Sequence, residues 1–218
     1  MISFFKVLRR DCAALIERGQ PIVLSCGFLV LASTLYPFAI GPDQVKLAQL
    51  APGIVWVLAL FLGLLHLEKL YGEDAASGAL EQLAAAGVPA WWFGFTRSAA
   101  HWLMAFMPLI ILSPALLIIL GVKEDAVLLP VLSLLVGTPA LSFIGSWGAA
   151  LTLGARQSVL VVTLVVFPLM IPTLIFGVSA AAPQFGSDGA MSLCLAVTLL
   201  SAVICPIATH LSLRASLE

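Results

Sequence analysis

Six long apolar segments constrain this chain more than any other feature of its sequence. They lie near residues 21–41, 51–67, 98–121, 126–153, 157–180 and 190–213. A helix needs about 20 apolar residues to cross a hydrocarbon core of about 30 Å. Each segment is close to or above that length, so the sequence predicts an all-α membrane protein with six transmembrane helices. Connections are short except for residues 68–97, and we expect a single transmembrane domain over residues 1–218.

The composition excludes an ordinary soluble domain and gives no sign of nucleic-acid binding. The 218 residues are 61% hydrophobic and 10% charged, whereas soluble domains are about 45–50% apolar and about 25% charged. The formal net charge is −1. The four cysteines are scattered without a CxxC pair. We interpret them as small apolar residues, and not as a disulfide framework, a metal site or a haem attachment.

Residues 2–18 have the pattern of a helix that lies in the membrane interface. Basic residues combined with aromatic residues on an apolar side are typical of such helices. Gly19 and Pro21 are predicted to end it. The apolar arc comprises Phe4, Phe5, Leu8, Cys12, Leu15 and Ile16, and the opposite arc comprises Lys6, Arg10 and Glu17.

The distribution of lysine and arginine predicts the orientation, because cytoplasmic loops carry an excess of both. With a cytoplasmic N-terminus, the outer loops carry only Lys46 and Lys123. Both termini and residues 68–97 are therefore expected on the cytoplasmic side. The cytoplasmic side then carries Lys6, Arg9, Arg10, Arg18, Lys69, Arg97, Arg156 and Arg214.

The one long polar interruption, residues 68–89, is predicted to contain a short amphipathic helix of about nine residues. Ser77 is the expected N-cap, and Glu81 lies in the first turn, where the helix dipole favours an acid. Gly87 and Pro89 are predicted to end the helix. The residues alone leave two interpretations open: a docking surface for a soluble partner, or an ordinary interfacial loop helix. One side of the predicted helix carries Asp74, Gly78, Glu81 and Gln82, and the other carries Ala76, Leu80, Leu83 and Ala84.

The fourth span, 126–153, is long enough to tilt or to break at Pro139. The small-xxx-small spacing of nearby residues permits close helix packing. These residues are Gly145, Ala149, Ala150 and Gly154.

The sequence lacks the patterns of catalysis and nucleotide binding. It has no GxxxxGK[ST] loop and no HExxH motif, and the predicted spans carry no Asp, Glu, Lys or Arg near their centres. We therefore expect no catalytic, cofactor-binding or metal-binding residue in this chain. His66, His101 and His210 are predicted to lie near the cytoplasmic ends of spans. His101 and Trp102 are interpreted as an interfacial anchor, with a haem ligand as the weaker alternative.

The sequence resembles the CcmB family, which supplies the permease subunit of the bacterial cytochrome c maturation system. The resemblance covers nearly the whole chain, including its length and its six spans. Seven sequence blocks occur in the family's order: TLYPFAIGP (Thr34–Pro42), LAPGIVWV (Leu50–Val57), LEKLYGED (Leu67–Asp74), SGALEQL (Ser77–Leu83), AHWL (Ala100–Leu103), MPLIILSP (Met107–Pro114) and GTPALSFIG (Gly137–Gly145).

The resemblance implies an ABC-2 type permease with the type V exporter architecture in the bacterial inner membrane. The chain would couple ATP hydrolysis by a separate ATPase, CcmA, to release of the haem-loaded chaperone CcmE from CcmC, with CcmD in the complex. It would be present in two copies and bind no cofactor, because CcmA holds ATP and Mg²⁺ and partner subunits handle haem. The implied ATPase-coupling residues are Glu73, Asp74, Gly78, Leu80, Glu81, Gln82 and Leu83.

Two other functions fit the same residues. The chain could be an ABC-2 exporter permease for a drug, lipid or glycan. It could also be a membrane scaffold that tethers its partners and transmits no motion. Substrate-stimulated ATPase activity without haem-handling partners would favour the exporter, and an ATPase-dead complex that still matures cytochromes would favour the scaffold.

Overall fold

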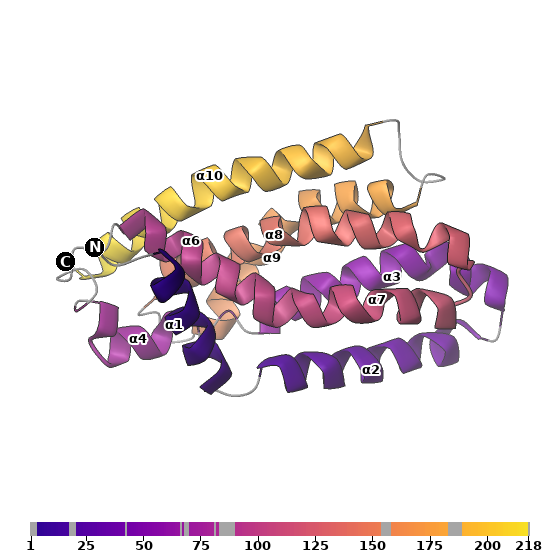
Figure 1. Ribbon diagram of the computed structural model, residues 1–218, viewed down its shortest axis with the longest axis horizontal. Coiled ribbons are helices and arrows are strands. Elements are labelled where there is room, and N and C mark those ends of the chain that lie inside the picture. Colours follow the sequence, from indigo (N-terminus) through magenta and orange to yellow (C-terminus); the bar gives the residue numbers. More distant parts are fainter. Residues whose placement is uncertain are drawn as a thin grey trace.

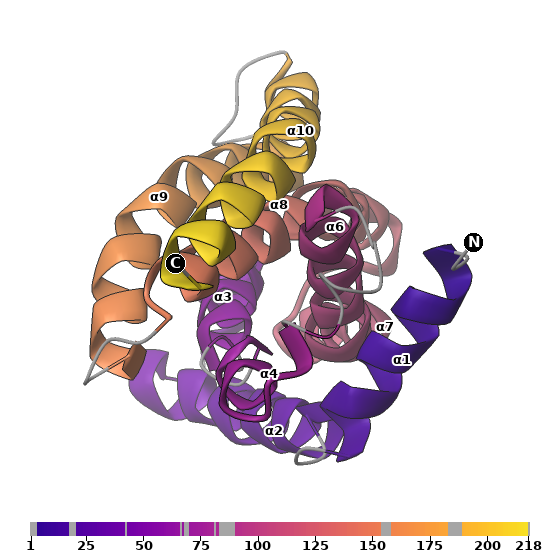
Figure 2. The ribbon, with the colours of Figure 1, turned by 90° about the vertical axis from the view of Figure 1, so that its left-hand side faces the viewer.

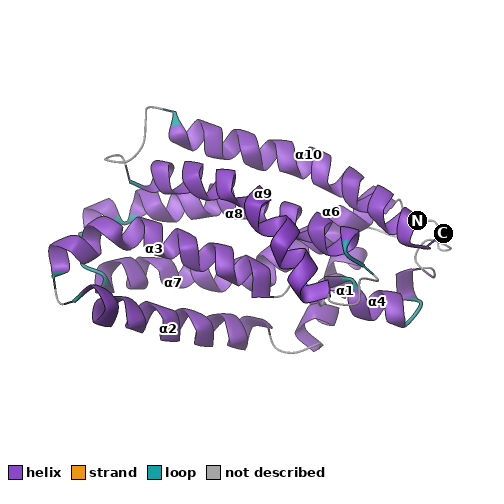
Figure 3. Cartoon of the chain, turned by 180° about the vertical axis from the view of Figure 1, so that it is seen from behind, coloured by secondary structure: helices purple, strands orange, loops and turns teal. Residues whose placement is uncertain are grey.

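The computed structural model describes residues 4–17, 21–41, 43–65, 67, 70–80, 82, 90–153, 158–182 and 189–217. Within these ranges the chain is helical with short turns, and no strand occurs (Figure 3). The α-helices are α1 (Phe4–Glu17), α2 (Pro21–Ile40), α3 (Gln44–Leu65), α4 (Gly72–Ala76), α6 (Ala90–His101), α7 (Met107–Ile119), α8 (Leu128–Leu151), α9 (Ser158–Ala181) and α10 (Ala190–Leu217). A π-helix, η2 (Trp102–Phe106), joins α6 to α7, and a short 3-10 helix, η3 (Glu124–Ala126), precedes α8.

The long helices run side by side, and both chain termini lie at the same end of the bundle (Figure 1). We call this the terminal end, and the opposite one the far end. Helices α1 and α4 also lie at the terminal end. Viewed from there, α1 is at the edge of the bundle, beside α6 (Figure 2). Both termini are expected at one end of the bundle when the chain runs along the bundle an even number of times.

Six helical segments are long and apolar enough to cross a membrane, which confirms the six predicted spans. The second span starts earlier than predicted, because α3 begins at Gln44 and not near residue 51. Asp43 caps this polar first turn by accepting hydrogen bonds from the backbone N–H groups of Val45 (3.1 Å) and Lys46 (3.2 Å). A capped helix can extend beyond its apolar run, which hydropathy alone does not detect.

The third span also starts earlier than predicted, at Ala90 and not near residue 98. The predicted span begins directly after Thr96 and Arg97, two polar residues. In the structure both are completely buried, so the helix carries them into the bundle. The polar groups that receive them come from other elements of the chain.

Helices α3 and α8 form the interior of the bundle. Over an apolar stretch of 18 residues in each of these two spans, 61% of the residues are buried, against 17–39% over the same length in the other four. Trp56 of α3 lies between them and donates a hydrogen bond from Nε1 to Ser133 Oγ of α8 at 3.0 Å. Gly177 of α9 allows this ring to approach, because an added Cβ there would lie 2.1 Å from Trp56 Cζ2.

Helix α8 continues from Leu128 to Leu151 through Pro139, so the break considered at that proline is absent. Gly145 does lie at a close contact, because an added Cβ would meet Leu67 Cδ2 at 2.6 Å. Gly154 lies outside the described residues.

The turn of π-helix in the third span has a local cause. A proline ring clashes with the carbonyl four residues earlier and lacks the N–H that would bond to it. For Pro108 that carbonyl belongs to Met104, which lies within η2. The wider π turn accommodates this ring without ending the helix, and turns of this kind recur at functional sites.

Candidate functional site

Residues 68–89, for which a coupling role is predicted and which we call the coupling segment, are only partly described. Asp74 and Leu80 are buried, with 2% and 5% of their surfaces exposed. Gly78 forms a turn, and Gln82 is exposed. Glu73 belongs to α4. The Glu73 side chain, all of Glu81 and Leu83, and the predicted stop at Gly87 and Pro89 lie outside the described residues.

The described residues correct the predicted helix boundary. Helix α4 precedes Ser77, whose hydroxyl donates to the carbonyl of Asp74 at 3.4 Å instead of capping a following helix. Gly78 then adopts φ +69°, a left-handed conformation that glycine tolerates and that commonly ends a helix. Gln82 N–H donates to Gly78 O at 3.2 Å as the helix resumes. Asp74 therefore does not lie on one continuous helix with Gly78 and Gln82, and a single helical wheel does not describe all three residues.

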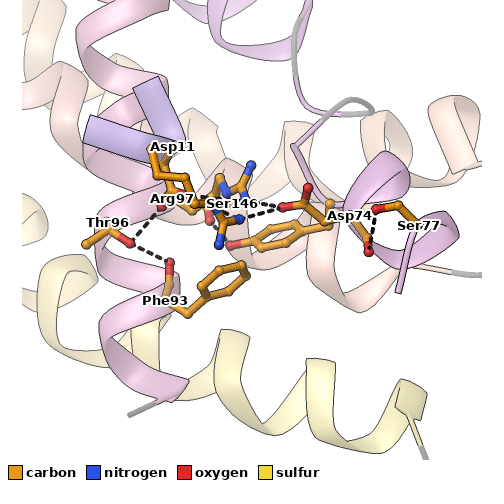
Figure 4. Close-up of polar contacts among 9 residues, drawn as sticks. Asp11, Asp74, Ser77, Phe93, Thr96, Arg97 and Ser146 are labelled. Atoms are coloured by element: carbon orange, nitrogen blue, oxygen red, sulfur yellow. Dashed lines mark hydrogen bonds and ion pairs between the residues drawn. The ribbon is translucent and has the colours of Figure 1, made fainter. Parts of the chain in front are cut away.

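Asp74 points into the protein and forms an ion pair with Arg97 of α6 (Figure 4). The same guanidinium nitrogen, Arg97 Nη2, lies 3.4 Å from Oδ1 of Asp11 in α1. Arg97 and Asp11 are both completely buried. Arg97 thus joins α1, residues 68–89 and the third span at the terminal end.

Arg10 completes this charge cluster, which consists of Asp11, Asp74, Arg97 and Arg10. Its Nη2 lies 3.3 Å from Asp74 Oδ2 and 3.6 Å from Asp11 Oδ1. The Arg10 side chain is 36% exposed, so it connects the buried pair to the surface. Two cations balance two anions, as the burial of charge requires.

A hydrogen bond and a pKa shift complete the surroundings of Asp11. Thr96 donates its hydroxyl hydrogen to Asp11 Oδ2 at 2.9 Å. Burial raises the pKa of the Asp11 carboxyl, and the charge of Arg97 is the largest influence that opposes it. Burial and the Asp11 charge also raise the pKa of the neighbouring thiol, Cys12.

Two aromatic rings flank the guanidinium of Arg97. Its Cζ lies 5.2 Å from the ring centroid of Phe93 and 5.7 Å from that of Tyr71. Such contacts are worth about 2 kcal/mol when the cation is desolvated. Tyr71 immediately precedes α4, and its hydroxyl shares a hydrogen bond with Ser146 of α8 at 2.7 Å. The cluster therefore also contacts the buried helix α8.

Sequence reasoning missed Asp11 and Arg97 as partners. Asp11 follows the buried residue Val7 by one helical turn, so it lies on the side of α1 that faces the protein. The predicted apolar arc instead contains Phe5, which is 77% exposed. A usable signal was available for Arg97, which is the only Asp, Glu, Lys or Arg between Pro89 and Lys123. A single charge in such a long apolar run requires a buried partner.

The prediction that His101 is an interfacial anchor is wrong. His101 is 1% exposed, and its Nδ1 shares a hydrogen bond with Ser142 Oγ of α8 at 2.9 Å. The early start of α6 makes His101 the twelfth residue of that helix, well inside the bundle. His210 is half-buried in α10, and His66 lies outside the described residues.

The cluster has the composition of a mechanical contact. Among the described residues, no group of three or more His, Cys, Asp or Glu side chains is placed to hold a metal ion. The cluster instead joins α1, α6 and the coupling segment through buried ion pairs. The dielectric constant is low in such surroundings, so the attraction between opposite charges is strong and depends on their geometry. A shift of α4 would therefore act directly on α1 and α6.

Known proteins resemble this chain over nearly its whole length. A family model described as CcmB protein matches residues 2–216. The chain is 37% identical to Heme exporter protein B of Haemophilus influenzae, with 99% of each chain covered. It is 38% identical to Heme exporter protein B of Paracoccus denitrificans, over 97% of this chain and 99% of the relative. It is 35% identical to the protein of that name from Escherichia coli, over the full length of both.

Proposed function

The chain belongs to the CcmB family, and we propose on that premise that it is the non-catalytic permease subunit of an ATP-driven complex in cytochrome c maturation. It is a multi-pass membrane protein, as its six apolar helices and its relatives indicate. In this proposal it resides in the bacterial inner membrane with both termini in the cytoplasm. The terminal end then faces the ATPase.

One observation carries the coupling role. Asp74 of the coupling segment forms a buried ion pair with Arg97 of the third span. A docking segment held only by loose surface contacts could move without moving the bundle. A buried pair resists separation, because removing one partner leaves an uncompensated charge at a cost of about 3–5 kcal/mol. Motion of the segment is therefore transmitted to α6 as a rigid-body shift.

The mechanism follows from this connection. A separate ATPase, CcmA, holds ATP and Mg²⁺ and docks on the coupling segment, where Gln82 is exposed. Nucleotide hydrolysis moves the segment, and the charge cluster passes this motion to α1 and α6. The shifted bundle then releases haem-loaded CcmE from CcmC, with CcmD as a further subunit and two copies of this chain. Haem stays with the partner subunits and is not bound by this chain.

The test compares D74N with wild type in the purified full complex. We expect D74N to retain the ATPase and its hydrolysis rate while releasing fewer haem-loaded chaperones per ATP. The expected loss is about 5- to 150-fold, the range of typical coupling free energies. D125N is the matched control, because Asp125 is an exposed acid at the far end, in η3. E81A and L83A are expected to uncouple as D74N does.

Each other outcome contradicts a defined part of the proposal. Wild-type release per ATP in D74N would remove the coupling role of the ion pair. Recovery of an ATPase without CcmC-like and CcmD-like partners would favour an exporter of another cargo. Recovery of no ATPase would favour a scaffold and exclude the coupling segment as a docking surface.

A further inference from the structure

Helix α8 carries a row of buried hydroxyls that begins at the terminal end and leads into the membrane. Thr138, Ser142 and Ser146 are spaced four residues apart, so they share one face of the helix. At most 1% of each residue's surface is exposed. At 1.5 Å per residue, the row extends about 12 Å along the helix axis. We call these three residues the hydroxyl stripe.

Each member of the stripe is bonded to a side chain from another element. Ser146 shares a 2.7 Å hydrogen bond with the hydroxyl of Tyr71. Ser142 shares one of 2.9 Å with His101 Nδ1. Thr138 accepts one of 2.9 Å from Nε1 of Trp102, the first residue of the π-helix.

A purely structural explanation would be that three hydroxyls satisfy three buried polar groups. Interhelical hydrogen bonds of this kind in membranes are worth about 0.6 kcal/mol on average. The first bond, however, involves the residue directly before α4. The ring of that residue, Tyr71, also lies 5.7 Å from the guanidinium of Arg97. The Tyr71 side chain therefore contacts both the charge cluster and the hydroxyl stripe.

The Tyr71 hydroxyl is suited to this position. Burial raises its pKa to about 12, so it remains protonated at neutral pH and can always donate or accept a hydrogen bond. Its partner Ser146 lies on α8, one of the two innermost helices. A shift of α4 that carries Tyr71 away from Ser146 would break this bond first, because the other two bonds come from α6 and η2.

We propose that Tyr71 is the positioning residue that links the coupling segment to α8 and that the hydroxyl stripe carries its displacement into the bundle. This inference rests on the proposed function. Each hydrogen bond of the stripe is weak and can break and re-form separately, so α8 can change its position against α6 in small steps. The charge cluster holds α4 against the bundle, and the hydroxyl stripe passes the movement of α4 on to α8.

The variants Y71F and S146A test the link. Y71F keeps the ring beside Arg97 and removes only the hydroxyl, and S146A removes the bonding partner. The matched control is Y36F, because Tyr36 is the only other tyrosine and lies half-buried in α2. The double variant Y71F/S146A reveals whether the two groups act as one pair.

The first readout is local and requires no partner protein. With ¹⁵N-labelled tryptophan, the full chain in detergent micelles gives an indole signal for Trp102, assigned by its loss in W102F. We expect Y71F and S146A to shift this signal and to speed hydrogen exchange of its N–H, although Trp102 is bonded to Thr138, eight residues of α8 away from Ser146. Y36F should leave both unchanged. An unaltered Trp102 signal in Y71F and S146A would overturn the stripe as a route.

The second readout is release of haem-loaded chaperone per ATP in the full complex. We expect Y71F and S146A to lower it about fivefold at an unchanged hydrolysis rate, with the double variant no worse than either single one. Wild-type release in Y71F, or additive losses in the double variant, would overturn the positioning role. If the wild-type complex itself releases no chaperone, the proposed function fails. The Trp102 signal alone then decides whether a change at Tyr71 or Ser146 reaches Thr138 at the other end of the hydroxyl stripe.

Discussion

Asp11 Oδ1 and Arg97 Nη2 lie 3.4 Å apart, although α2, α3 and α4 lie between their helices in the chain order. Both side chains are completely buried. Their contact fixes α1 against α6 by charge and not by apolar packing alone. Helix α1 is thereby joined to the third span through a buried ion pair.

R97M should destabilise the protein by about 3–5 kcal/mol, because it leaves Asp11 and Asp74 buried without their main partner. The measurement is the free energy of unfolding from denaturant titration in mixed detergent micelles. R9M is the matched control, since Arg9 is exposed on the same helix as Asp11. We expect R9M to change the stability by less than about 0.5 kcal/mol.

The triple variant D11N/D74N/R97M should be more stable than R97M, since no uncompensated charge remains buried. It should nevertheless lose coupling, because the connection between α4 and α6 is gone. If the triple variant released chaperone as wild type does, the cluster would have only a stabilising role.

The alkaline reactivity of Cys12 should report the charge of Asp11. Only the thiolate reacts with maleimides, and the Asp11 charge, together with burial, raises the pKa of the Cys12 thiol. D11N removes the charge contribution, so the pKa falls and the midpoint of the labelling-rate profile moves to lower pH. The measurement uses the single-cysteine background C26A/C194A/C205A. An unchanged midpoint in D11N, matching that of D125N, would show that Asp11 is not charged beside Cys12.

Substitutions at Leu80 and Gln82 should distinguish a residue that stabilises the coupling segment from one that binds the ATPase. L80A removes a buried side chain and should cost about 2–5 kcal/mol of unfolding free energy. Q82A alters an exposed side chain and should leave that stability within about 0.5 kcal/mol. We expect Q82A instead to weaken ATPase binding about fivefold, a loss of about 1 kcal/mol, in a titration with the purified ATPase. Equal affinities in Q82A and wild type would place the docking contact elsewhere.

G148A should disrupt the contact between α8 and α9. An added Cβ would lie 1.9 Å from Val166 Cγ2, and a β-branched side chain has little freedom to move aside. Overpacking of this kind costs about 1–3 kcal/mol, measurable by the same denaturant titration. G27A is the control, because an added Cβ at Gly27 meets nothing within 4 Å. V166A in the G148A background should restore part of the loss, and no recovery would indicate a backbone origin.

The predictable part of the fold is local. Each span could be recognised from its own apolar run, and residues 4–17 could be recognised as a helix from their amphipathic pattern. The boundaries at Gln44 and Ala90 were wrong because a cap at Asp43 and buried partners for Arg97 extend the helices beyond the apolar runs.

The candidate site was only partly predictable. Gly78 was placed within the predicted helix, whereas in the structure it forms a turn with φ +69°, which glycine adopts without strain. Asp74 was named as a coupling residue without a predicted partner, and the structure places it in a buried ion pair with Arg97. A helical wheel shows which side of a helix a residue occupies, but it does not show what that side meets.

By itself, the sequence determined that this chain has six helices long and apolar enough to cross a membrane, because the transfer of an apolar helix into hydrocarbon depends mainly on the residues of that helix. The tertiary structure alone decided that Asp11, Asp74 and Arg97 meet in one buried cluster and that Tyr71 connects it to α8. A buried charge is stable only beside its partner, and that partner comes from another element that packing brings into contact.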